Sequence, residues 1–331
     1  MSVKNIQEFM DELTKIQKSS DHEKNRVMLY RGHEIETWKL TPSLYRNKAY
    51  PLNEHKYIND AIIDFPNDLQ VHETNFEKLA FLQHYGIPTR VLDLTQNPLV
   101  ALYFACLESG KTTAYNASVE VLNIDEGLVK YYNSDSVSVL SAFSRLSNEK
   151  LIEIRGQFKE SITTNSNKTI VKLCDHHSKA KQRQGLLEKF STAYGGLNSS
   201  VKYEIDMELN KSANIGYLYH EIKYEKPQFE KKIRLEDYDN RILCVKTKMS
   251  DARIQAQQGM FLLFGIYNSD KKELPKINSV KYSELIKNKK IIIDKSSKKT
   301  ILAELNMLGI NKQRLFPDFS YSGKTILDKY K

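Results

Sequence analysis

The stretch Leu79 to Cys106 reads LAFLQHYGIPTRVLDLTQNPLVALYFAC, and it decides the fold. Apolar residues at helical spacing lead to a turn at Gly86 and Pro88, a short β-prone run follows, and a second helix begins at Pro98. The stretch is too apolar for a surface connection, yet it holds several polar side chains. Because buried polar groups need partners, we expect a hydrogen-bonded cluster between the two helices. Its members are Gln83, His84, Arg90, Asp93 and Thr95.

The composition is that of an ordinary globular protein. The chain has 331 residues, of which 40% are hydrophobic and 27% are charged. This length suffices for one large domain or two medium ones. No apolar run approaches the roughly 20 residues that span a bilayer, and the N-terminus lacks the apolar segment of a signal peptide. We therefore expect no membrane association.

The cysteines and histidines give little support for a disulfide or a metal site. Cys106, Cys174 and Cys244 lie far apart in the sequence and form no CxxC pair. We expect neither a disulfide framework nor a zinc site, which fits a cytoplasmic protein. The pair His176-His177 has no supporting ligand beyond Asp175, so we expect no metal there either.

The chain is basic, with a formal net charge of +9 at pH 7. A basic excess favours anionic partners, nucleic acid above all. The alternative is that a gene of biased base composition encodes many lysines that have no partner. The lysines are scattered, apart from runs such as 287–290 and 298–299, and this pattern leaves both interpretations open.

Hydrophobic spacing predicts a mixture of helices and strands. Helices are expected at 3–18, 53–65, 72–85, 98–108, 137–155, 178–193 and 297–308. Strands are expected at 27–30, 89–93, 118–124, 170–174, 222–229, 231–235, 259–267 and 291–293. Asn97 and Pro98 form a good helix start, since Asn caps a helix and Pro suits its first turn. The helix that follows is apolar on almost every face and should be central.

The first predicted strand runs into Arg31-Gly32, which is an informative ending. The glycine lets another group approach the backbone closely, and the arginine suits a carboxylate or a phosphate. Alternatively, Arg31 pairs with an internal carboxylate such as Asp93, and the two interpretations are compatible. Further along, the single tryptophan, Trp38, is expected to anchor a loop on the core.

The polar cluster also has structural interpretations. His84 suits a helix C-terminus where it bonds backbone carbonyls, and Gln83 suits exposed backbone at the turn. Arg90 and Asp93 could pair beneath the helix, and a buried ion pair is by itself poor evidence of function. The chain has no Walker loop, no dinucleotide GxGxxG and no GxSxG elbow.

Several motifs together resemble the FRG domain, a family named for a Phe/Tyr-x-Arg-Gly signature. They are Tyr30-Arg31-Gly32, Trp38-x-Leu-x-Pro-Ser-Leu-x-Arg46, Gln83-His84-Tyr85-Gly86-x-Pro-Thr-Arg90-x-Leu-Asp93-x-Thr95, Arg253-Ile-x-Ala-Gln257-x-Gly259-x-Phe261 and the tail 301–326. The resemblance implies one FRG-type domain over 1–331. Its parts are a core motif half at 27–106, an insertion at 110–240, and a distal strand motif with C-terminal helices at 241–331.

These segments are also similar to the ADP-ribosyltransferase fold. That similarity implies an α+β class, with mixed helices packed on a central, largely antiparallel sheet. It implies an NAD-dependent effector that acts on nucleic acid or protein, as a toxin or in phage defence, with NAD as substrate and no metal. Such enzymes carry a catalytic glutamate on a late strand, where this chain has Gln257. The alternative is a non-catalytic module that binds or senses a nucleotide or phosphorylated ligand.

The resemblance also assigns roles to individual residues. Arg31 would grip the pyrophosphate or ribose of NAD, Thr95 would brace the cleft, and Gln257 would touch the ribose beside the scissile bond. Tyr85 or Tyr103 would stack on nicotinamide. The expected catalytic residues are thus Arg31, Thr95 and Gln257, and the expected binding residues are Gly32, Gln83, His84, Tyr85, Arg90, Asp93 and Tyr103. Asp93 is the nearest carboxylate that could replace the missing glutamate.

Overall fold

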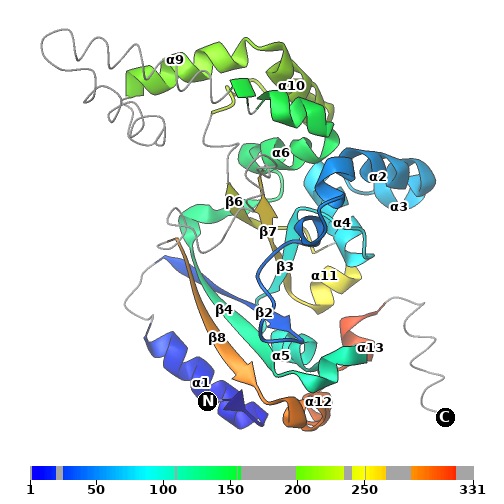
Figure 1. The fold of residues 1–331 in the computed structure, drawn as a ribbon, viewed down its shortest axis with the longest axis vertical. Coiled ribbons are helices and arrows are strands. Elements are labelled where there is room, and N and C mark those ends of the chain that lie inside the picture. Colours follow the sequence, from blue (N-terminus) through cyan, green and yellow to red (C-terminus); the bar gives the residue numbers. More distant parts are fainter. Residues whose placement is uncertain are drawn as a thin grey trace, which may run out of the picture.

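The computed structural model describes residues 2–19, 25–108, 110–154, 156–157, 199–234, 241–249, 251–265 and 285–317 (Figure 1). In these parts of the chain, eight strands form one sheet with the order β1-β8-β4-β2-β3-β7-β6-β5. Their bounds are β1 Ser2–Val3, β2 Arg26–His33, β3 Val91–Thr95, β4 Ala117–Asp125, β5 Val129–Tyr131, β6 Ile242–Lys246, β7 Gly259–Phe264 and β8 Ile286–Ile293. All neighbouring pairs are antiparallel except β1–β8 and β5–β6. The predicted α+β class with a largely antiparallel sheet is confirmed.

Helices cover the two halves of the sheet separately (Figure 1). The half formed by β8, β4 and β2 packs against α1 Ile6–Lys18, α5 Pro98–Cys106 and α12 Lys298–Met307. The half formed by β3, β7 and β6 shares a core with α2 Tyr50–Asp64, α4 Asn75–His84, α6 Asp135–Ala142 and α10 Ala213–Glu225. Further α-helices are α3 Pro66–Gln70, α9 Ser199–Asn210, α11 Ala252–Ala256 and α13 Lys312–Leu315, and residues 148–154 are also helical.

Of the two helices that flank β3, α5 begins at Pro98 as predicted, and α4 begins at Asn75, three residues after the predicted start at 72. Thr74 and Glu77 form a reciprocal capping box at the start of α4, and Gly86 ends that helix with a left-handed φ of 87°. At the start of α5, the Asn97 side chain accepts from the backbone N–H groups of Leu99 and Val100. These caps fix both ends of the connection that carries β3 into the centre of the sheet.

Gly32 brings β2 and α5 into direct contact. A Cβ atom at Gly32 would lie 2.1 Å from the main-chain oxygen of Ala101 and 2.5 Å from the main-chain nitrogen of Ala105. Only glycine therefore lets the helix rest on the strand at this point. The group that approaches the glycine of the Arg-Gly motif is the backbone of α5.

The structure corrects several predicted elements. The stretch 222–229 was predicted as a strand, but residues up to Glu225 belong to α10, whose Ile215, Leu218 and Ile222 form one buried helical stripe. The stretch 231–235 forms no strand in its described part, 231–234. β8 is longer than the predicted 291–293 and begins at Ile286; its first half contains three exposed lysines, so hydrophobic spacing did not reveal it. The predicted elements at 170–174 and 178–193, together with Cys174 and His176-His177, lie outside the described residues.

The other predictions are confirmed with small shifts. The strands predicted at 118–124 and 259–267 are β4 and β7, and the helix predicted at 137–155 divides into α6, a 3₁₀ turn and a further helical segment. Cys106 and Cys244 are buried and free. Among the described helices, none is long and apolar enough to cross a membrane.

Candidate functional site

A pocket of about 260 Å³ opens beside the point where β2 and β3 meet. The two strands share the pair Tyr30–Thr95, and both residues line the pocket. Because β7 pairs with the other side of β3, with Gly259 opposite Thr95, the turn before β7 also reaches the pocket. Of the ten residues expected at the site, seven line it: Arg31, Gly32, Gln83, His84, Asp93, Thr95 and Gln257.

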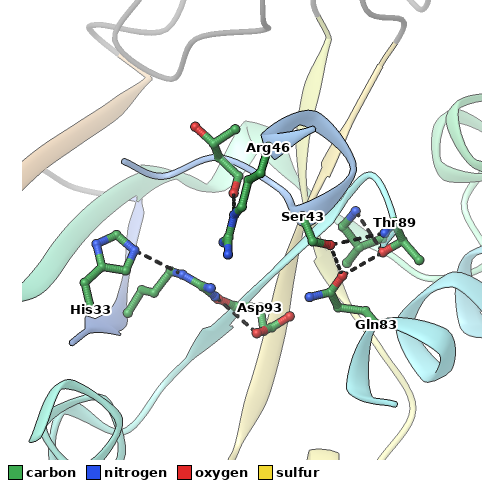
Figure 2. Close-up of polar contacts among 9 residues, drawn as sticks. His33, Ser43, Arg46, Gln83, Thr89 and Asp93 are labelled. Atoms are coloured by element: carbon green, nitrogen blue, oxygen red, sulfur yellow. Dashed lines mark hydrogen bonds and ion pairs between the residues drawn. The ribbon is translucent and has the colours of Figure 1, made fainter. Parts of the chain in front are cut away.

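Arg31 is held by contacts to β3 and to its own strand. Its Nη1 donates to the main-chain oxygen of Asp93 and lies 3.2 Å from Asp93 Oδ2, and its Nε donates to Nε2 of His33 at 3.3 Å (Figure 2). The ion pair with Asp93 that the sequence suggested as an alternative is therefore present. Three contacts fix the guanidinium at the wall of the pocket.

A buried polar chain continues from Arg31 away from the pocket. His33 Nδ1 lies 3.7 Å from Glu120 Oε1, and Glu120 accepts from Asn288 at 2.8 Å and pairs with Lys290 at 2.8 Å. Burial lowers the pKa of His33, and it outweighs the opposite effect of Glu120. The neutral imidazole leaves Nε2 free to accept from Arg31, so His33 acts as a brace for the guanidinium.

Asp93 is ionised at neutral pH. Burial opposes ionisation, but the positive charge of Arg31, with a contribution from His84, outweighs it and lowers the pKa of the Asp93 carboxyl. Arg46 adds a further positive charge near this pair, as Figure 2 shows, and its Nε donates to the main-chain oxygen of Thr41 at 3.1 Å. Burial and the neighbouring Arg31 lower the pKa of Arg46.

Gln83 is oriented by two hydroxyl groups. Its Oε1 accepts from Ser43 Oγ at 2.7 Å and from Thr89 Oγ1 at 3.1 Å (Figure 2). The sequence suggested that Gln83 would bond the exposed backbone at the turn. That backbone bonds the two hydroxyls instead: the Thr89 N–H donates to Ser43 Oγ, and the Val91 N–H donates to Thr89 Oγ1. Among the residues that the structure describes, the Gln83 amide is thus anchored through its oxygen.

Thr95 and Gln257 connect the three segments of the site. Thr95 is buried, and its hydroxyl donates to the main-chain oxygen of Gln257 at 2.6 Å and accepts from the N–H of Asn97 at 3.0 Å. Thr95 therefore braces the pocket wall. The Gln257 side chain is also committed, because its Nε2 donates to the main-chain oxygen of Leu315 at 3.0 Å.

Arg90 belongs to a different part of the molecule. Its Nε donates to Glu54 Oε1 at 2.9 Å, and its Nη2 donates to Glu54 Oε2. Both side chains are almost completely buried. Burial alone would lower the pKa of Arg90, but the Glu54 carboxylate raises it. Arg90 therefore pairs with a carboxylate of α2 rather than with Asp93, and it lies outside the pocket, contrary to the expected binding role.

The two tyrosines expected to stack on a ligand also lie outside the pocket lining. Tyr85 is 55% exposed and packs against Phe81, with ring centroids 4.5 Å apart. Tyr103 lies on α5 and is buried in the hydrophobic core. The aromatic surface of the pocket comes instead from the residue after Tyr103, Phe104, and from Tyr30, Trp38 and Phe316.

Trp38 and Arg253 are lining residues that sequence reasoning did not assign to the site. Trp38 was expected on the core but is 41% exposed at the pocket, with its ring edge-on to His33. Arg253 donates to the main-chain oxygen of His84 at 2.6 Å, and its guanidinium lies 4.6 Å from the Phe316 ring centroid. The spacing of Arg253 and Gln257, four residues apart within one motif, was the available signal for Arg253.

The comparisons with known proteins agree with the motifs. Residues 26–114 match the FRG domain family. The chain therefore contains an FRG domain, and β2, α4, β3 and α5 all lie within the matched residues. No curated protein and no solved structure matches the chain.

Proposed function

We propose that the pocket binds NAD and that the protein is an ADP-ribosyltransferase-like effector that acts on nucleic acid or protein. One observation carries this proposal. The end of β2, the end of β3 and the turn before β7 are adjacent in the sheet and bring Arg31, Thr95 and Gln257 to one pocket. These are the three segments to which the resemblance gives the NAD-binding roles.

The pocket offers suitable chemistry for one half of a dinucleotide. Arg31 and Arg253 supply positive charge for phosphate oxygens, and the rings of Trp38, Phe104 and Phe316 supply apolar surface for a planar ring. Ligand pockets commonly measure about 300–1,000 Å³, so about 260 Å³ suits a ring and its ribose. The rest of a dinucleotide would lie at the open mouth.

Asp93 is the residue best suited to assist bond cleavage. When the bond between the ribose and nicotinamide breaks, nicotinamide leaves with the electron pair, and positive charge develops on the ribose. A nearby carboxylate stabilises that charge. Gln257 is neutral, whereas Asp93 lies in the pocket with a lowered pKa. An acceptor nucleophile then bonds to the ribose and releases its proton to solvent.

The second candidate is a module that binds the ligand without cleaving it. The observation that favours it is the state of Gln257, which stands where a glutamate is expected and whose amide nitrogen is committed to Leu315. In addition, Arg31 already neutralises Asp93. Under this candidate the same pocket would sense a nucleotide or a phosphorylated ligand.

Further proposals concern the whole chain. We propose that 1–331 acts as one FRG-type unit, because β1 and β8, from opposite parts of the sequence, join the same sheet as the FRG segment. The net charge of +9 supports nucleic acid as the acceptor. A role as a toxin or in phage defence, in the cytoplasm, is consistent with an NAD-consuming activity and with two free buried cysteines.

The experiment incubates the full chain with NAD and with RNA, DNA or protein as acceptor, and measures nicotinamide release. The test variant is Asp93→Asn, and the control is Tyr224→Ala, since Tyr224 is 81% exposed on α10 away from the pocket. Release by the wild type and the control, but not by Asp93→Asn, supports the transferase. Saturable binding of NAD, ADP-ribose or a nucleotide without nicotinamide release supports the sensing module, and absence of binding by all of them overturns both candidates.

A further inference from the structure

Arg31 keeps one part of its guanidinium for a ligand. A guanidinium has five N–H donors in a fixed fork, and three of them are engaged here: Nε donates to His33, and Nη1 donates to the main-chain oxygen and to Oδ2 of Asp93. Nη2 makes no hydrogen bond with the residues that the structure describes, and it does not belong to the solvent-shielded polar atoms that lack a partner. Nη2 is therefore accessible at the pocket that Arg31 lines.

Arg46 presents a second guanidinium that has fewer contacts. It ends the 3₁₀ turn Ser43–Arg46 and is exposed. Its Nε donates to the main-chain oxygen of Thr41 at 3.1 Å, whereas the four N–H groups on Nη1 and Nη2 donate to none of the described residues. Figure 2 shows that the Arg46 side chain extends from the turn toward Asp93. The bond at Nε therefore leaves the outer edge of the fork for a ligand.

The charges around this point do not balance. Burial lowers the pKa of Arg46, the positive charge of Arg31 lowers it further, and Asp93 opposes both effects. Because Arg31 and Asp93 already form an ion pair, the three groups together carry one positive charge in excess. The other acidic and basic residues of the pocket lining, Glu34 and Arg253, cancel in sign. Holding two like charges together is unfavourable, and an anion between them removes that cost.

We propose that Arg31 and Arg46 together bind the diphosphate of a nucleotide ligand. Arg31 Nη2 donates to the phosphate next to the ribose in the pocket, and Arg46 donates to the second phosphate at the mouth. This order follows from position, since Arg31 lines the pocket whereas Arg46 is exposed and lies beyond the lining. Guanidinium forks match the geometry of phosphate oxygens. The inference rests on the proposed function and deepens it, because it assigns a residue to the part of the dinucleotide outside the pocket.

The test compares ligands that carry one and two phosphates. Calorimetric titration measures the affinity of the full chain and of Arg46→Gln for NAD, ADP-ribose and nicotinamide mononucleotide. We expect the variant to bind NAD and ADP-ribose at least tenfold more weakly, which is the effect of about one charge-assisted hydrogen bond. It should bind nicotinamide mononucleotide, which has a single phosphate, as tightly as the wild type does. The matched control is Lys48→Gln, which removes the same charge from an exposed residue of the same segment and should change none of the three affinities.

The outcomes separate this inference from the proposed function. Unchanged affinity of Arg46→Gln for NAD and ADP-ribose overturns the inference and leaves NAD binding intact. An equal loss for nicotinamide mononucleotide also overturns it, because the two arginines would then share one phosphate. An equal loss in Lys48→Gln overturns it as well, since the effect would be general electrostatic attraction. If ADP-ribose binds in an Arg46-dependent way and NAD does not bind, the proposed function fails and the diphosphate site stands. If no ligand binds, both fail.

A second variant separates the charge of Arg46 from a structural role. Arg46→Lys keeps the positive charge but has a single ammonium group, which cannot hold Thr41 and a phosphate with the geometry of the fork. Its affinity for NAD should therefore lie between those of the wild type and Arg46→Gln. An affinity as low as that of Arg46→Gln would contradict a contact between this charge and the ligand. Circular dichroism establishes that each variant is folded.

Discussion

Replacing Gly32 with alanine should destabilise the whole fold, although the change adds a single methyl group. The added Cβ would lie 2.1 Å from the Ala101 oxygen, 2.5 Å from the Ala105 nitrogen and 3.0 Å from the Phe104 Cβ. The first two atoms are helix backbone, which has no rotamer to change. Relieving the contacts therefore moves α5 by roughly 1 Å within a close-packed core.

The size of the effect follows from that displacement. α5 is buried on nearly every side, so a shift disturbs its contacts with β2 and with α12 together. Overpacking a core typically costs about 1–3 kcal/mol and occasionally more, and backbone clashes belong at the upper end. We expect a loss of about 3 kcal/mol in the free energy of unfolding, or roughly 6 °C or more in melting temperature.

Urea denaturation followed by circular dichroism measures the loss, with Gly216→Ala as the matched control. Gly216 lies in α10, and a Cβ there meets no atom within 4 Å. The control should be slightly stabilising, by about 0.5–1 kcal/mol, because alanine favours a helix. If Gly32→Ala is as stable as the wild type within about 0.5 kcal/mol, the packing explanation of the Arg-Gly motif is refuted.

Three further predictions concern buried polar groups. Arg90→Met leaves the Glu54 carboxylate unpaired and should cost about 3–5 kcal/mol, most of which a second change, Glu54→Leu, should restore in urea denaturation; a single variant as stable as the wild type would contradict this. Burial lowers the pKa of His33, so the unfolded chain binds a proton first as pH falls below about 6.5. Stability should therefore fall from pH 7.5 to pH 6, and less so in His33→Gln, whereas identical pH profiles would exclude this role. Thr95→Val removes the hydroxyl that bonds the main-chain oxygen of Gln257, and it should lower the free energy of unfolding by about 1–3 kcal/mol. A smaller loss in urea denaturation would show that Thr95 does not brace the pocket wall.

Local signals were sufficient for the elements around the site. Asn97 was predicted to cap α5, and the structure confirms it; the capping box of Thr74 and Glu77 at the start of α4 is equally local, although it was not predicted. The Arg-Gly ending likewise predicted a close backbone approach, although it did not say that α5 is the neighbour. Short-range chemistry of this kind depends on residues within a few positions of one another, so a single sequence contains it.

Long-range partners were not accessible in the same way. Arg90 pairs with Glu54, which is 36 residues away in the sequence. Gln257 bonds the main-chain oxygen of Leu315, which is 58 residues away. Nothing in the composition of either segment specifies its partner. The choice of aromatic residue in the pocket also depends on a distant contact. Phe104 rather than Tyr103 lines the pocket, because the packing of α5 on Gly32 fixes which side of the helix faces it.

The errors in the middle of the chain have a physical cause as well. In α10, a window that begins at Ile222 contains β-branched and aromatic residues and favours a strand. The helical stripe becomes visible only when Ile215 and Leu218 are included. Hydrophobic spacing therefore identifies an element reliably only when the window covers the whole of it.

The most direct test of the account is a calorimetric titration of NAD into the wild-type chain and into Arg31→Ala, with folding of both established by circular dichroism. Arg31 is held at the pocket wall by Asp93 and His33, so it is positioned to bind a ligand phosphate or ribose without rearrangement. The account predicts saturable binding to the wild type and a loss of roughly tenfold to a hundredfold in affinity for the variant. Equal affinity in the two proteins, or no binding to the wild type, would contradict it.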